Sequence, residues 1–382
     1  EFEWPEKVKL PGYNPTYDGH PKQISRALQL LCNAKKPVII AGGGIVHSNA
    51  HKELEKLAND LHVPVTNTLM GIGTFPKDNP LSLGMMGMHG EYVANHSVND
   101  CDVLCAIGVR FSDRITGNVK KFAPDAQIIH IDIDPCSISK NVRVDIPIVG
   151  DAKSVISAML NEFEEQKYDI NIEAKDKWFL EIQERKKLEP PKSADTGLLN
   201  PVDVIHDINH VTRNMDAIIC TEVGQHQMWT AQLYNFKRPR QLITSGGLGT
   251  MGFGFPAAMG ASVAKKDHVV INVAGDGSIQ MNIQELATCV DYNIPVIVAI
   301  INNGWLGMVR QWQERIFHKH YSQTKISSPD YVKLAEAYGA LGFMVDKEED
   351  VIPTLKKAIE ARRPTLIDFR VEPFEMVYPW VL

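Results

Sequence analysis

Two short motifs, each placed directly after a run of apolar residues, constrain the fold of this chain more than any other feature. Gly275-Asp276-Gly277 follows the mostly apolar run 269–274, and Asn302-Asn303 follows the apolar residues 296–301. Short apolar runs of this kind are typical of strands that a parallel sheet buries on both faces. Ligands bind open α/β sheets at the carboxyl ends of the strands, so neighbouring strands would bring Asp276 and Asn303 together at one sheet edge.

The same residues have the chemistry of a diphosphate and magnesium site. Mg²⁺ prefers about six oxygen ligands in octahedral geometry and is usually bound together with phosphate groups. The Asp276 carboxylate and the Asn303 amide can supply oxygen ligands, and the two flanking glycines let the backbone approach a phosphate closely. A Gly-Asp-Gly segment alone is most often an ordinary turn, but Asn-Asn after the next apolar run favours the binding site.

Short apolar runs alternate with amphipathic stretches along the whole chain. This alternation predicts an α/β protein with two doubly wound parallel-sheet domains. A helix is expected from about residue 48 to 61, and a second helix is expected to begin at Asn200-Pro201, an N-cap residue followed by proline. The expected strands are residues 37–41, 63–66, 103–107 and 128–132 in the first half, and 217–220, 268–273, 296–301 and 366–369 in the second.

Changes in composition divide the chain into four expected segments. Residues 1–21 are predicted to be an extended linker, and residues 22–160 the first α/β domain. Residues 161–197 are rich in charge and are predicted to be a mostly helical connector, and residues 198–382 form the second α/β domain. The chain begins with Glu1 and has no signal-peptide pattern at its start, so we expect it to begin inside a longer protein.

Composition argues against several classes of protein. The net charge of −6 does not suit a nucleic-acid binder, which needs clustered lysine and arginine. No apolar run approaches the roughly 20 residues that cross a membrane. The six cysteines lie mostly in apolar runs and not at zinc-ligand spacing, which indicates reduced thiols in a cytoplasmic protein. His318 and His320 could suggest a metal site, but a solvated loop is the favoured interpretation.

The motifs and the segments around them resemble a known enzyme family. Gly-Asp-Gly, 24 residues and Asn-Asn resemble the thiamine-diphosphate motif of the pyruvate-decarboxylase-like enzymes. Residues 221–229, 244–252 and 302–312 narrow the resemblance to acetohydroxyacid synthase, also called acetolactate synthase, in its large catalytic subunit. The resemblance covers essentially the whole chain and implies three cofactors: thiamine diphosphate, Mg²⁺ and FAD.

The resemblance implies roles for residues of the second half. Asp276 and Asn303 would bind Mg²⁺ through their side chains, and Trp305 through its backbone carbonyl. Met251 would be the apolar wedge that bends the thiamine cofactor, and the Gly249 carbonyl would orient the aminopyrimidine ring. The residues that would line the diphosphate are Gly224, Gln225, His226, Gly275, Gly277, Ser278 and Gly307.

The first half resembles the FAD-binding middle domain of the same family. Gly42-Gly43-Gly44 lies at a strand-to-helix turn, where free N–H groups favour phosphate, although a simple tight turn would have the same pattern. Residues 83–90 are rich in Met and Gly and are interpreted as a loop that packs on a flat ring. The implied FAD contacts are Gly42, Gly43, Gly44, Thr68, Leu69, Met70, Met86, Gly87, Met88, His89, Gly108, Arg110, Asp113, Asp132, Ile133, Asp134, Asp151 and Ala152.

The resemblance also implies a reaction, the first common step of valine, isoleucine and leucine biosynthesis. Pyruvate loses CO₂, and the remaining two-carbon unit is joined to a second pyruvate or to 2-ketobutyrate. Arg114 would bind the carboxylate of the second keto acid through its bidentate fork, and Met308, Val309 and Trp312 would form the acceptor pocket. FAD would have a structural role. The resemblance further implies a cytoplasmic homodimer with a small regulatory subunit.

One essential residue of the family has no counterpart in this chain. A glutamate from an amino-terminal domain contacts the aminopyrimidine N1′ in the family, so we expect these 382 residues to be the second and third of three domains and to be inactive alone. Three alternatives stay open: an FAD-dependent pyruvate oxidase, an FAD-independent catabolic acetolactate synthase, and a non-catalytic module that binds nucleotide cofactors. The Met- and Gly-rich segment favours carboligation over oxidation, and the flavin segments argue against the second alternative.

Overall fold

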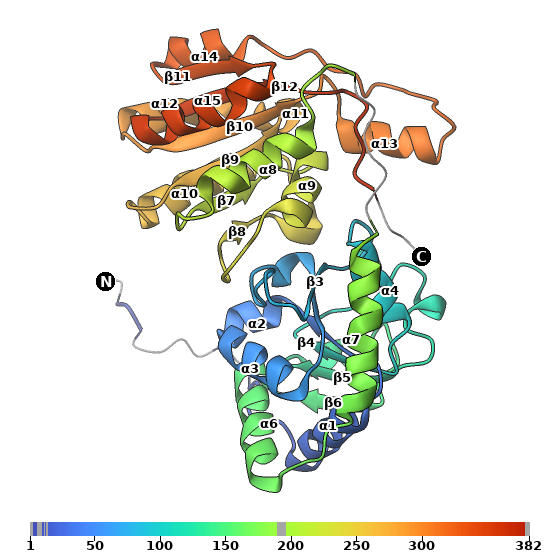
Figure 1. Ribbon diagram of the computed structural model, residues 1–382. Helices are drawn as coiled ribbons and strands as arrows, with labels where there is room; N and C mark the ends of the chain where they lie inside the picture. Colours follow the sequence, from blue (N-terminus) through green and yellow to red (C-terminus); the bar gives the residue numbers. More distant parts are fainter. Residues whose placement is uncertain (1–2, 6–9, 11, 13, 189–195, 379–382) are drawn as a thin grey trace.

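A computed structural model describes residues 3–5, 10, 12, 14–188 and 196–378 of the chain. Two six-stranded sheets organise these residues, and every pairing between their strands is parallel (Figure 1). The prediction of two doubly wound parallel α/β sheets is therefore confirmed. The expected linker 1–21 and the expected connector 161–197 lie in part outside the described residues.

The first sheet has the strand order β3-β2-β1-β4-β5-β6. The chain leaves β1 on one side to form β2 and β3 and then returns on the other side as β4. The carboxyl ends of β1 and β4 therefore flank the point where the strand order reverses, which is where open α/β sheets bind ligands. The strands are β1 (Pro37–Ala41), β2 (Val65–Asn67), β3 (Ser82–Met85), β4 (Val103–Ile107), β5 (Gln127–Asp132) and β6 (Ile146–Val149).

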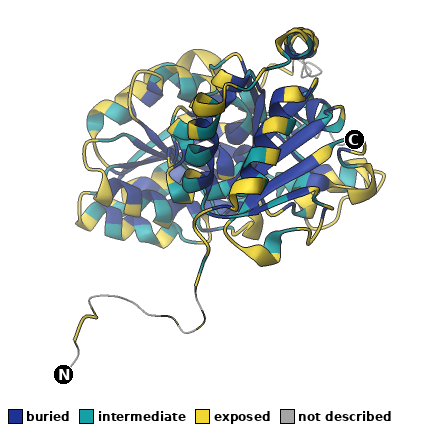
Figure 2. Cartoon of the chain, turned by 90° about the horizontal axis from the view of Figure 1, so that it is seen from below, coloured by how far each residue is buried: buried dark blue, intermediate teal, exposed yellow. Residues whose placement is uncertain are grey.

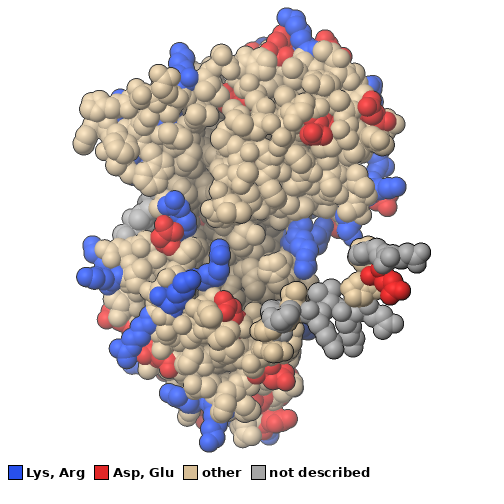
Figure 3. Space-filling view, turned by 180° about the vertical axis from the view of Figure 1, so that it is seen from behind, with Lys and Arg blue, Asp and Glu red and all other residues tan. Residues whose placement is uncertain are grey.

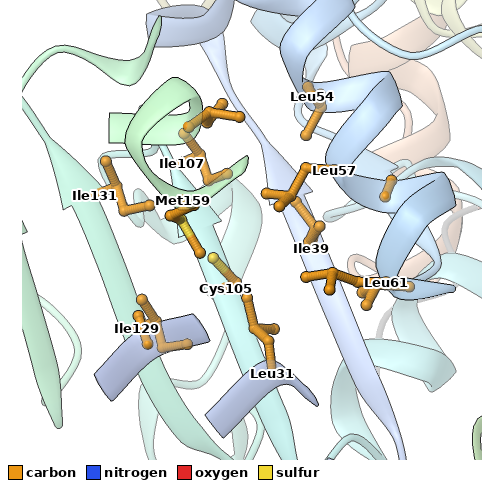
Figure 4. Packing of buried hydrophobic residues seen from close by; sticks show 14 of the residues in the cluster. Leu31, Ile39, Leu54, Leu57, Leu61, Cys105, Ile107, Ile129, Ile131 and Met159 are labelled. Carbon is orange, nitrogen blue, oxygen red and sulfur yellow. The ribbon is translucent and has the colours of Figure 1, made fainter. Parts of the chain in front are cut away.

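Helices cover both faces of the first sheet. Residues of α1, α3 and α6 pack with Ile39, Cys105 and Ile129 on one face (Figure 4), and α4 and α7 cover the other face, where Trp178 is buried. We call α1 to α7 with this sheet the first unit. Its helices are α1 (Pro21–Asn33), α2 (Gly43–Ser48), α3 (His51–Leu61), α4 (Tyr92–Asn99), α5 (Asp113–Thr116), α6 (Ala152–Gln166) and α7 (Ile172–Lys186).

Two local predictions for the first unit need correction. The helix expected from residue 48 to 61 is two helices, because Asn49 has a φ of 54° and ends α2 before α3 begins. The segment 83–90 is not a loop throughout, because Ser82–Met85 form the edge strand β3, with Leu83 buried in the core. A strand of four residues is too short for its alternation to stand out against the surrounding Met and Gly.

The second sheet has the strand order β11-β12-β10-β9-β7-β8. β9 and β10 are direct neighbours, with Ile301 opposite Gly275, which is the condition under which the two sequence motifs are expected to lie together at adjacent strand ends. The strand order reverses between β7 and β9. The strands are β7 (Ile218–Thr221), β8 (Leu242–Ile243), β9 (Val270–Gly275), β10 (Val296–Asn302), β11 (Leu341–Val345) and β12 (Thr365–Arg370).

Helices also cover both faces of the second sheet, and we call α8 with all that follows it the second unit. α8 begins as predicted, with the Asn200 side chain accepting a hydrogen bond from the N–H of Val202 at 2.8 Å. α8, α9 and α15 pack on one face, and α10, α12 and α14 on the other. The helices are α8 (Pro201–Thr212), α9 (Gln225–Leu233), α10 (Gly254–Ala264), α11 (Asp276–Ile279), α12 (Leu286–Asp291), α13 (Gly307–Arg315), α14 (Tyr331–Tyr338) and α15 (Glu348–Ala361).

The two units meet where α9 approaches β3 and the segment that follows it (Figure 1). The Gln232 side chain donates a hydrogen bond to the His89 carbonyl at 2.7 Å, and the Gln232 carbonyl accepts one from Lys77. Most strands are buried between helices whose outer faces carry exposed residues (Figure 2). The surface is hollowed between the units, with Lys and Arg side chains bordering the hollow (Figure 3). No helix among the described residues is long and apolar enough to cross a membrane.

Candidate functional site

Glycines form the two turns at the point where the strand order of the first sheet reverses, which we call the reversal point. Gly42 and Gly44 follow β1, and Gly108 follows β4 with a φ of +63°. A Cβ atom on Gly108 would lie 2.4 Å from the Cα of Gly44, and one on Gly42 would lie 2.1 Å from the Gly108 carbonyl oxygen. Only glycine lets the two turns approach this closely. The result is a bare backbone surface at the carboxyl edge of the sheet, where a phosphate or a flat ring can lie.

A cavity of about 1100 Å³ opens beside this glycine surface and reaches the second unit. This volume is slightly above the range of about 300 to 1,000 Å³ that is usual for ligand pockets, which suits a large ligand such as a dinucleotide. Gly42, Gly87 and Asp113 do not line it, although each was predicted to contact FAD. The predicted flavin residues that do line it are Gly43, Gly44, Thr68, Leu69, Met70, Met86, Met88, His89, Gly108, Arg110, Asp132, Ile133, Asp134, Asp151 and Ala152.

The Met- and Gly-rich segment after β3 is held by backbone contacts. The Asn95 side chain accepts a hydrogen bond from the Gly87 N–H at 2.8 Å and donates one to the Gly87 carbonyl at 2.9 Å. The Met88 N–H donates to the Arg114 carbonyl at 2.8 Å. Burial and, to a smaller extent, the Arg114 charge lower the pKa of His89 to about 4. The segment is therefore held by hydrogen bonds to α4 and α5 and carries no charge at neutral pH, which suits a surface that binds a flat ring.

Three of the predicted substrate residues share the large cavity. Arg114 comes from α5 in the first unit, and Met308 and Trp312 come from α13 in the second, so the cavity is built by both units. Arg114 lies with one guanidinium nitrogen 3.9 Å from the sulfur of Met88. Val309 is half exposed and does not line the cavity. The structure thus gathers one cation and two large apolar side chains, an arrangement that fits a small carboxylate with an apolar body.

A buried histidine lies at the reversal point of the second sheet, between the ends of β7 and β9. His226 follows β7, and a Cβ on Gly275, at the end of β9, would lie 2.9 Å from its Cε1 atom. Gly224, with a φ of +149°, makes room for the same ring. Burial lowers the pKa of His226 to about 3, and its Nε2 atom has no hydrogen-bond partner among the described residues. A neutral ring with one unpaired nitrogen at a strand end fits a site that a polar ligand completes.

The predicted metal ligands meet at the ends of β9 and β10. The Asp276 carboxylate accepts hydrogen bonds from the Gly304 N–H at 3.1 Å and from the Ser328 hydroxyl at 3.0 Å. The Asn303 side-chain oxygen accepts one from the Trp305 N–H at 3.1 Å. Burial raises the pKa of Asp276 to about 6. The described residues hold no cluster of three or more His, Cys, Asp or Glu suited to a metal. One carboxylate beside an amide and backbone oxygens fits Mg²⁺ bound together with a diphosphate.

Two buried glutamines connect this site to the last described segment of the chain. The Gln225 side chain accepts a hydrogen bond from Asn303 at 3.2 Å and donates to Gln311 and to the Glu375 carbonyl, both at 2.9 Å. A Cβ on Gly307 would lie 2.1 Å from the Gln225 side-chain oxygen. The Gln225 amide is thus bonded within the protein. Its contribution to a diphosphate site would come from its backbone N–H at the start of α9.

The other predicted residues of this site lie close to the turn after β9. The Ser278 hydroxyl accepts a hydrogen bond from the Gly275 N–H at 3.0 Å and so closes the turn. A Cβ on Gly277 would lie 3.8 Å from the end of the Met251 side chain, which places the predicted wedge next to the predicted diphosphate residues. Gly249, with a φ of +62°, lines the large cavity, whereas Met251 does not.

Three side chains that support this site were not predicted from the sequence: Glu222, Ser328 and Tyr331. Glu222 is fully buried and accepts hydrogen bonds from the N–H groups of Gly252 at 2.6 Å and Phe255 at 2.9 Å. Burial raises the pKa of Glu222, and these N–H groups oppose the rise. An acidic residue directly after an apolar strand was the available signal for Glu222. Ser328 and Tyr331 follow the Gly-Asp-Gly motif by about 50 residues, so no local pattern connects them to it.

Two protein families match this chain. Residues 24–159 match the family described as "Thiamine pyrophosphate enzyme, central domain". Residues 222–369 match "Thiamine pyrophosphate enzyme, C-terminal TPP binding domain". The first match includes the whole of the first sheet, and the second begins directly after β7 and includes Asp276 and Asn303.

Curated relatives resemble the chain over nearly its whole length. It is 49% identical to the "Probable acetolactate synthase large subunit" of Methanocaldococcus jannaschii, over 97% of this chain and 63% of that protein. It is 44% identical to the "Acetolactate synthase isozyme 3 large subunit" of Escherichia coli, over 99% and 67%. It is also 44% identical to the "Acetolactate synthase" of Mycobacterium leprae, over 100% and 62%. The chain therefore spans between 62% and 67% of the length of these three relatives.

Proposed function

Since the chain belongs to the thiamine pyrophosphate enzymes, and among them to the acetolactate synthase large subunits, we propose that it supplies the cofactor sites of an enzyme that forms acetolactate from pyruvate. The observation that carries this proposal is the meeting of Asp276, Asn303 and His226 at adjacent strand ends, where the His226 Nε2 atom has no hydrogen-bond partner among the described residues. The match of residues 222–369 to a thiamine pyrophosphate-binding domain supports the same assignment.

We propose that the second unit binds thiamine diphosphate with Mg²⁺. Asp276, Asn303 and the Trp305 carbonyl would hold the metal. Gly224, Gln225, His226, Gly275, Gly277, Ser278 and Gly307 would surround the diphosphate. Met251 and Gly249 would position the rings of the cofactor. The support is the turn after β9, where Asp276 and Ser278 are buried. A Cβ on Gly275 would lie 2.9 Å from the His226 ring, so glycine is needed there.

We propose that the first unit binds FAD along the glycine surface after β1 and β4. The cavity beside this surface is lined both by Asp132 at the end of β5 and by Met88 in the segment after β3. In this arrangement the flavin serves as a structural group between the two units. We propose the domain limits 22–160 for the flavin domain, 161–197 for the connector and 198–382 for the thiamine-diphosphate domain, with residues 1–21 as a linker.

The protein's own contribution to the reaction is positioning and exclusion of water. Thiamine diphosphate, when bound, supplies the electron sink for the decarboxylation of a 2-keto acid. Arg114 would bind the carboxylate of the acceptor keto acid, because a guanidinium forms two parallel hydrogen bonds with it. Met308 and Trp312 would cover the acceptor, with Val309 at the entrance, and keep out water that would otherwise end the reaction without carbon–carbon bond formation.

The remaining parts of the proposal concern substrates, partners and location. We propose pyruvate and 2-ketobutyrate as acceptors, a homodimer of the complete subunit, a small regulatory subunit as partner, and a cytoplasmic location. The chain's similarity to proteins named as large subunits of acetolactate synthase supports pyruvate as a substrate and a further subunit as partner.

The test is acetolactate formation from pyruvate in the presence of thiamine diphosphate, Mg²⁺ and FAD. The enzyme to assay is a chimera in which this chain replaces the matching segment of the M. jannaschii relative. We expect the chimera to form acetolactate and its Asp276→Ala variant to lose at least about 100-fold in activity, the size of effect expected when a metal site that organises the cofactor is lost. A folded chimera that forms no acetolactate, or that reduces its flavin with pyruvate at the rate of turnover, would contradict the proposal.

A further inference from the structure

The Asp276 residue is held at two of its atoms by a segment about 50 positions further along the chain. Its carboxylate is almost fully buried and accepts the Ser328 hydroxyl at 3.0 Å, in addition to the Gly304 N–H. Its backbone carbonyl accepts the Tyr331 hydroxyl at 2.7 Å. Tyr331 is itself buried at the start of α14. Ser328 and Tyr331 thus fix both the side chain and the backbone of one residue.

Ser328 lies at the end of a chain of polar groups, of which Asn302 and Asp368 are buried. The Asn302 side chain donates a hydrogen bond to Asp368 at 2.8 Å, and Asp368 pairs with Arg370 at 2.7 Å. With its nitrogen used in this way, Asn302 turns its oxygen toward the Ser328 hydroxyl, at 3.4 Å. The hydroxyl hydrogen therefore has two acceptors. The carboxylate of Asp276 is both nearer and charged, and hydrogen bonds to charged acceptors are the stronger ones.

We infer that Ser328, supported by Tyr331, is a positioning residue that sets the rotamer in which Asp276 presents its carboxylate to a divalent cation. This inference rests on the proposed function. It adds to the proposed metal site a residue that does not itself bind the metal. Residues that hydrogen-bond a metal ligand keep it in the orientation that binds, and their loss typically weakens metal affinity about 10- to 100-fold. With Ser328 shortened to alanine, only backbone N–H groups, among them that of Gly304, hold the carboxylate, which can then turn away from the metal position.

The chain offers a matched control next to the residue itself. Ser327 is exposed, whereas Ser328 is partly buried against Asp276, so the two serines differ in environment and not in chemistry. The experiment titrates Mn²⁺ into the full 382-residue chain with thiamine diphosphate present and follows free Mn²⁺ by electron paramagnetic resonance. The variants are Ser328→Ala, Ser327→Ala and Tyr331→Phe. Denaturant unfolding of each variant separates a loss of metal affinity from a loss of fold.

We expect the Mn²⁺ dissociation constant to rise about tenfold or more in Ser328→Ala, by a smaller factor in Tyr331→Phe, and not to change in Ser327→Ala. An unchanged constant in Ser328→Ala, with the parent chain binding Mn²⁺, would overturn this inference and leave the proposed function intact. A parent chain that binds no Mn²⁺ with thiamine diphosphate would overturn the proposed metal site and this inference together.

A second pair of variants keeps the test decisive if Ser328→Ala does not fold. Ser328→Thr and Ser328→Val introduce side chains of nearly the same shape, and only the threonine keeps the hydroxyl. Weak Mn²⁺ binding in Ser328→Val with near-parent binding in Ser328→Thr would support the hydroxyl's role. Equal Mn²⁺ binding in the two variants would overturn it.

Discussion

The strand order reverses at one point in each sheet, and different chemical groups form these two points. After β1 and β4 in the first unit, glycine backbones pack on one another without intervening side chains. After β7, β9 and β10 in the second unit, the buried polar side chains of Glu222, His226 and Asp276 form the site, and the two carboxylates accept hydrogen bonds from backbone N–H groups. The point where the strand order reverses is thus a bare backbone surface in the first unit and a group of buried polar side chains in the second.

This difference predicts two kinds of sensitivity to mutation. A site made of glycine backbones fails through steric overlap, which the surrounding structure cannot relieve without moving a strand end. A site made of buried polar groups fails when one partner is removed and the other is left without a hydrogen bond. The predictions below test this distinction, in order from the largest expected effect to the smallest.

The largest effect is expected for Gly108→Ala in the first unit. A Cβ there would lie 2.4 Å from the Gly44 Cα, and the residue must also keep a φ of +63°. We expect a loss of about 4 kcal/mol or more in the free energy of unfolding, measured by denaturant titration. The matched control is Gly339→Ala, which has a φ of +85° and only an ordinary contact with Val290, so about 1 kcal/mol is expected. Equal losses in the two variants would show that backbone strain, and not overlap, dominates.

Acid sensitivity is expected at one histidine in each unit. Burial lowers the pKa of His226 to about 3 and that of His89 to about 4, both below the unfolded value of about 6.5. The unfolded chain therefore binds protons that the folded chain does not, and stability falls as pH falls from about 6.5 towards these values. Between pH 7 and pH 4.5 we expect each histidine to account for about 2 to 3 kcal/mol of this fall.

The measurement compares unfolding free energies at pH 7 and pH 4.5 for His226→Gln and His89→Gln. Each substitution should reduce the fall in stability by the amount given above, because glutamine does not titrate. His318→Gln, at an exposed position, is the control. A fall as large in the two buried variants as in the parent would show that other groups cause the acid sensitivity.

Glu222→Gln tests the second unit's dependence on buried acceptors. Glutamine keeps the shape of the side chain but replaces one carboxylate oxygen with a nitrogen that cannot accept the Gly252 or Phe255 N–H. We expect a loss of about 2 kcal/mol in unfolding free energy and weaker binding of thiamine diphosphate, because Gly252 follows Met251 directly. Glu360→Gln, at an exposed position on α15, should change neither quantity. If the affinity for thiamine diphosphate is unchanged in Glu222→Gln, the Glu222 hydrogen bonds stabilise the loop around Gly252 but do not contribute to cofactor binding.

The smallest effect is expected at the contact between the units. Gln232→Ala removes the hydrogen bond to the His89 carbonyl, and a single bond of this kind contributes about 1 kcal/mol. Native-state hydrogen exchange of β4 and β9 reports the two sheets separately. We expect protection in the two strands to diverge in the variant, because the units open more independently. Protection that falls equally in both strands would indicate that the units unfold as one body.

The sequence predicted the two sheets because their strands are short apolar runs followed by turns, a pattern that needs no distant information. Asp276 and Asn303 could be predicted to follow strands, and to meet if those strands are neighbours, as β9 and β10 are in the structure. The resemblance inferred from residues 221–229, 244–252 and 302–312 is confirmed by the family matches and the curated relatives.

The parts that the sequence could not predict are those that depend on distant packing. The edge strand β3 is short and lies in a Met- and Gly-rich segment, so its pairing with β2 decides its structure. Ser328 and Tyr331 reach Asp276 only because the segment before α14 folds back over the end of β9. The side chain of Gln225 bonds to Gln311 and the Glu375 carbonyl, groups that lie 86 and 150 positions further along the chain.

The most direct test of the account is an isothermal titration of thiamine diphosphate into this chain, once with Mg²⁺ and once with EDTA. It should be made for the parent chain and for Asp276→Ala. The account predicts saturable binding by the parent with Mg²⁺ and little or none with EDTA or in Asp276→Ala. Binding of equal strength in all of these conditions, or no binding by the parent with Mg²⁺, would contradict the assignment of the strand ends of β9 and β10 as the diphosphate and metal site.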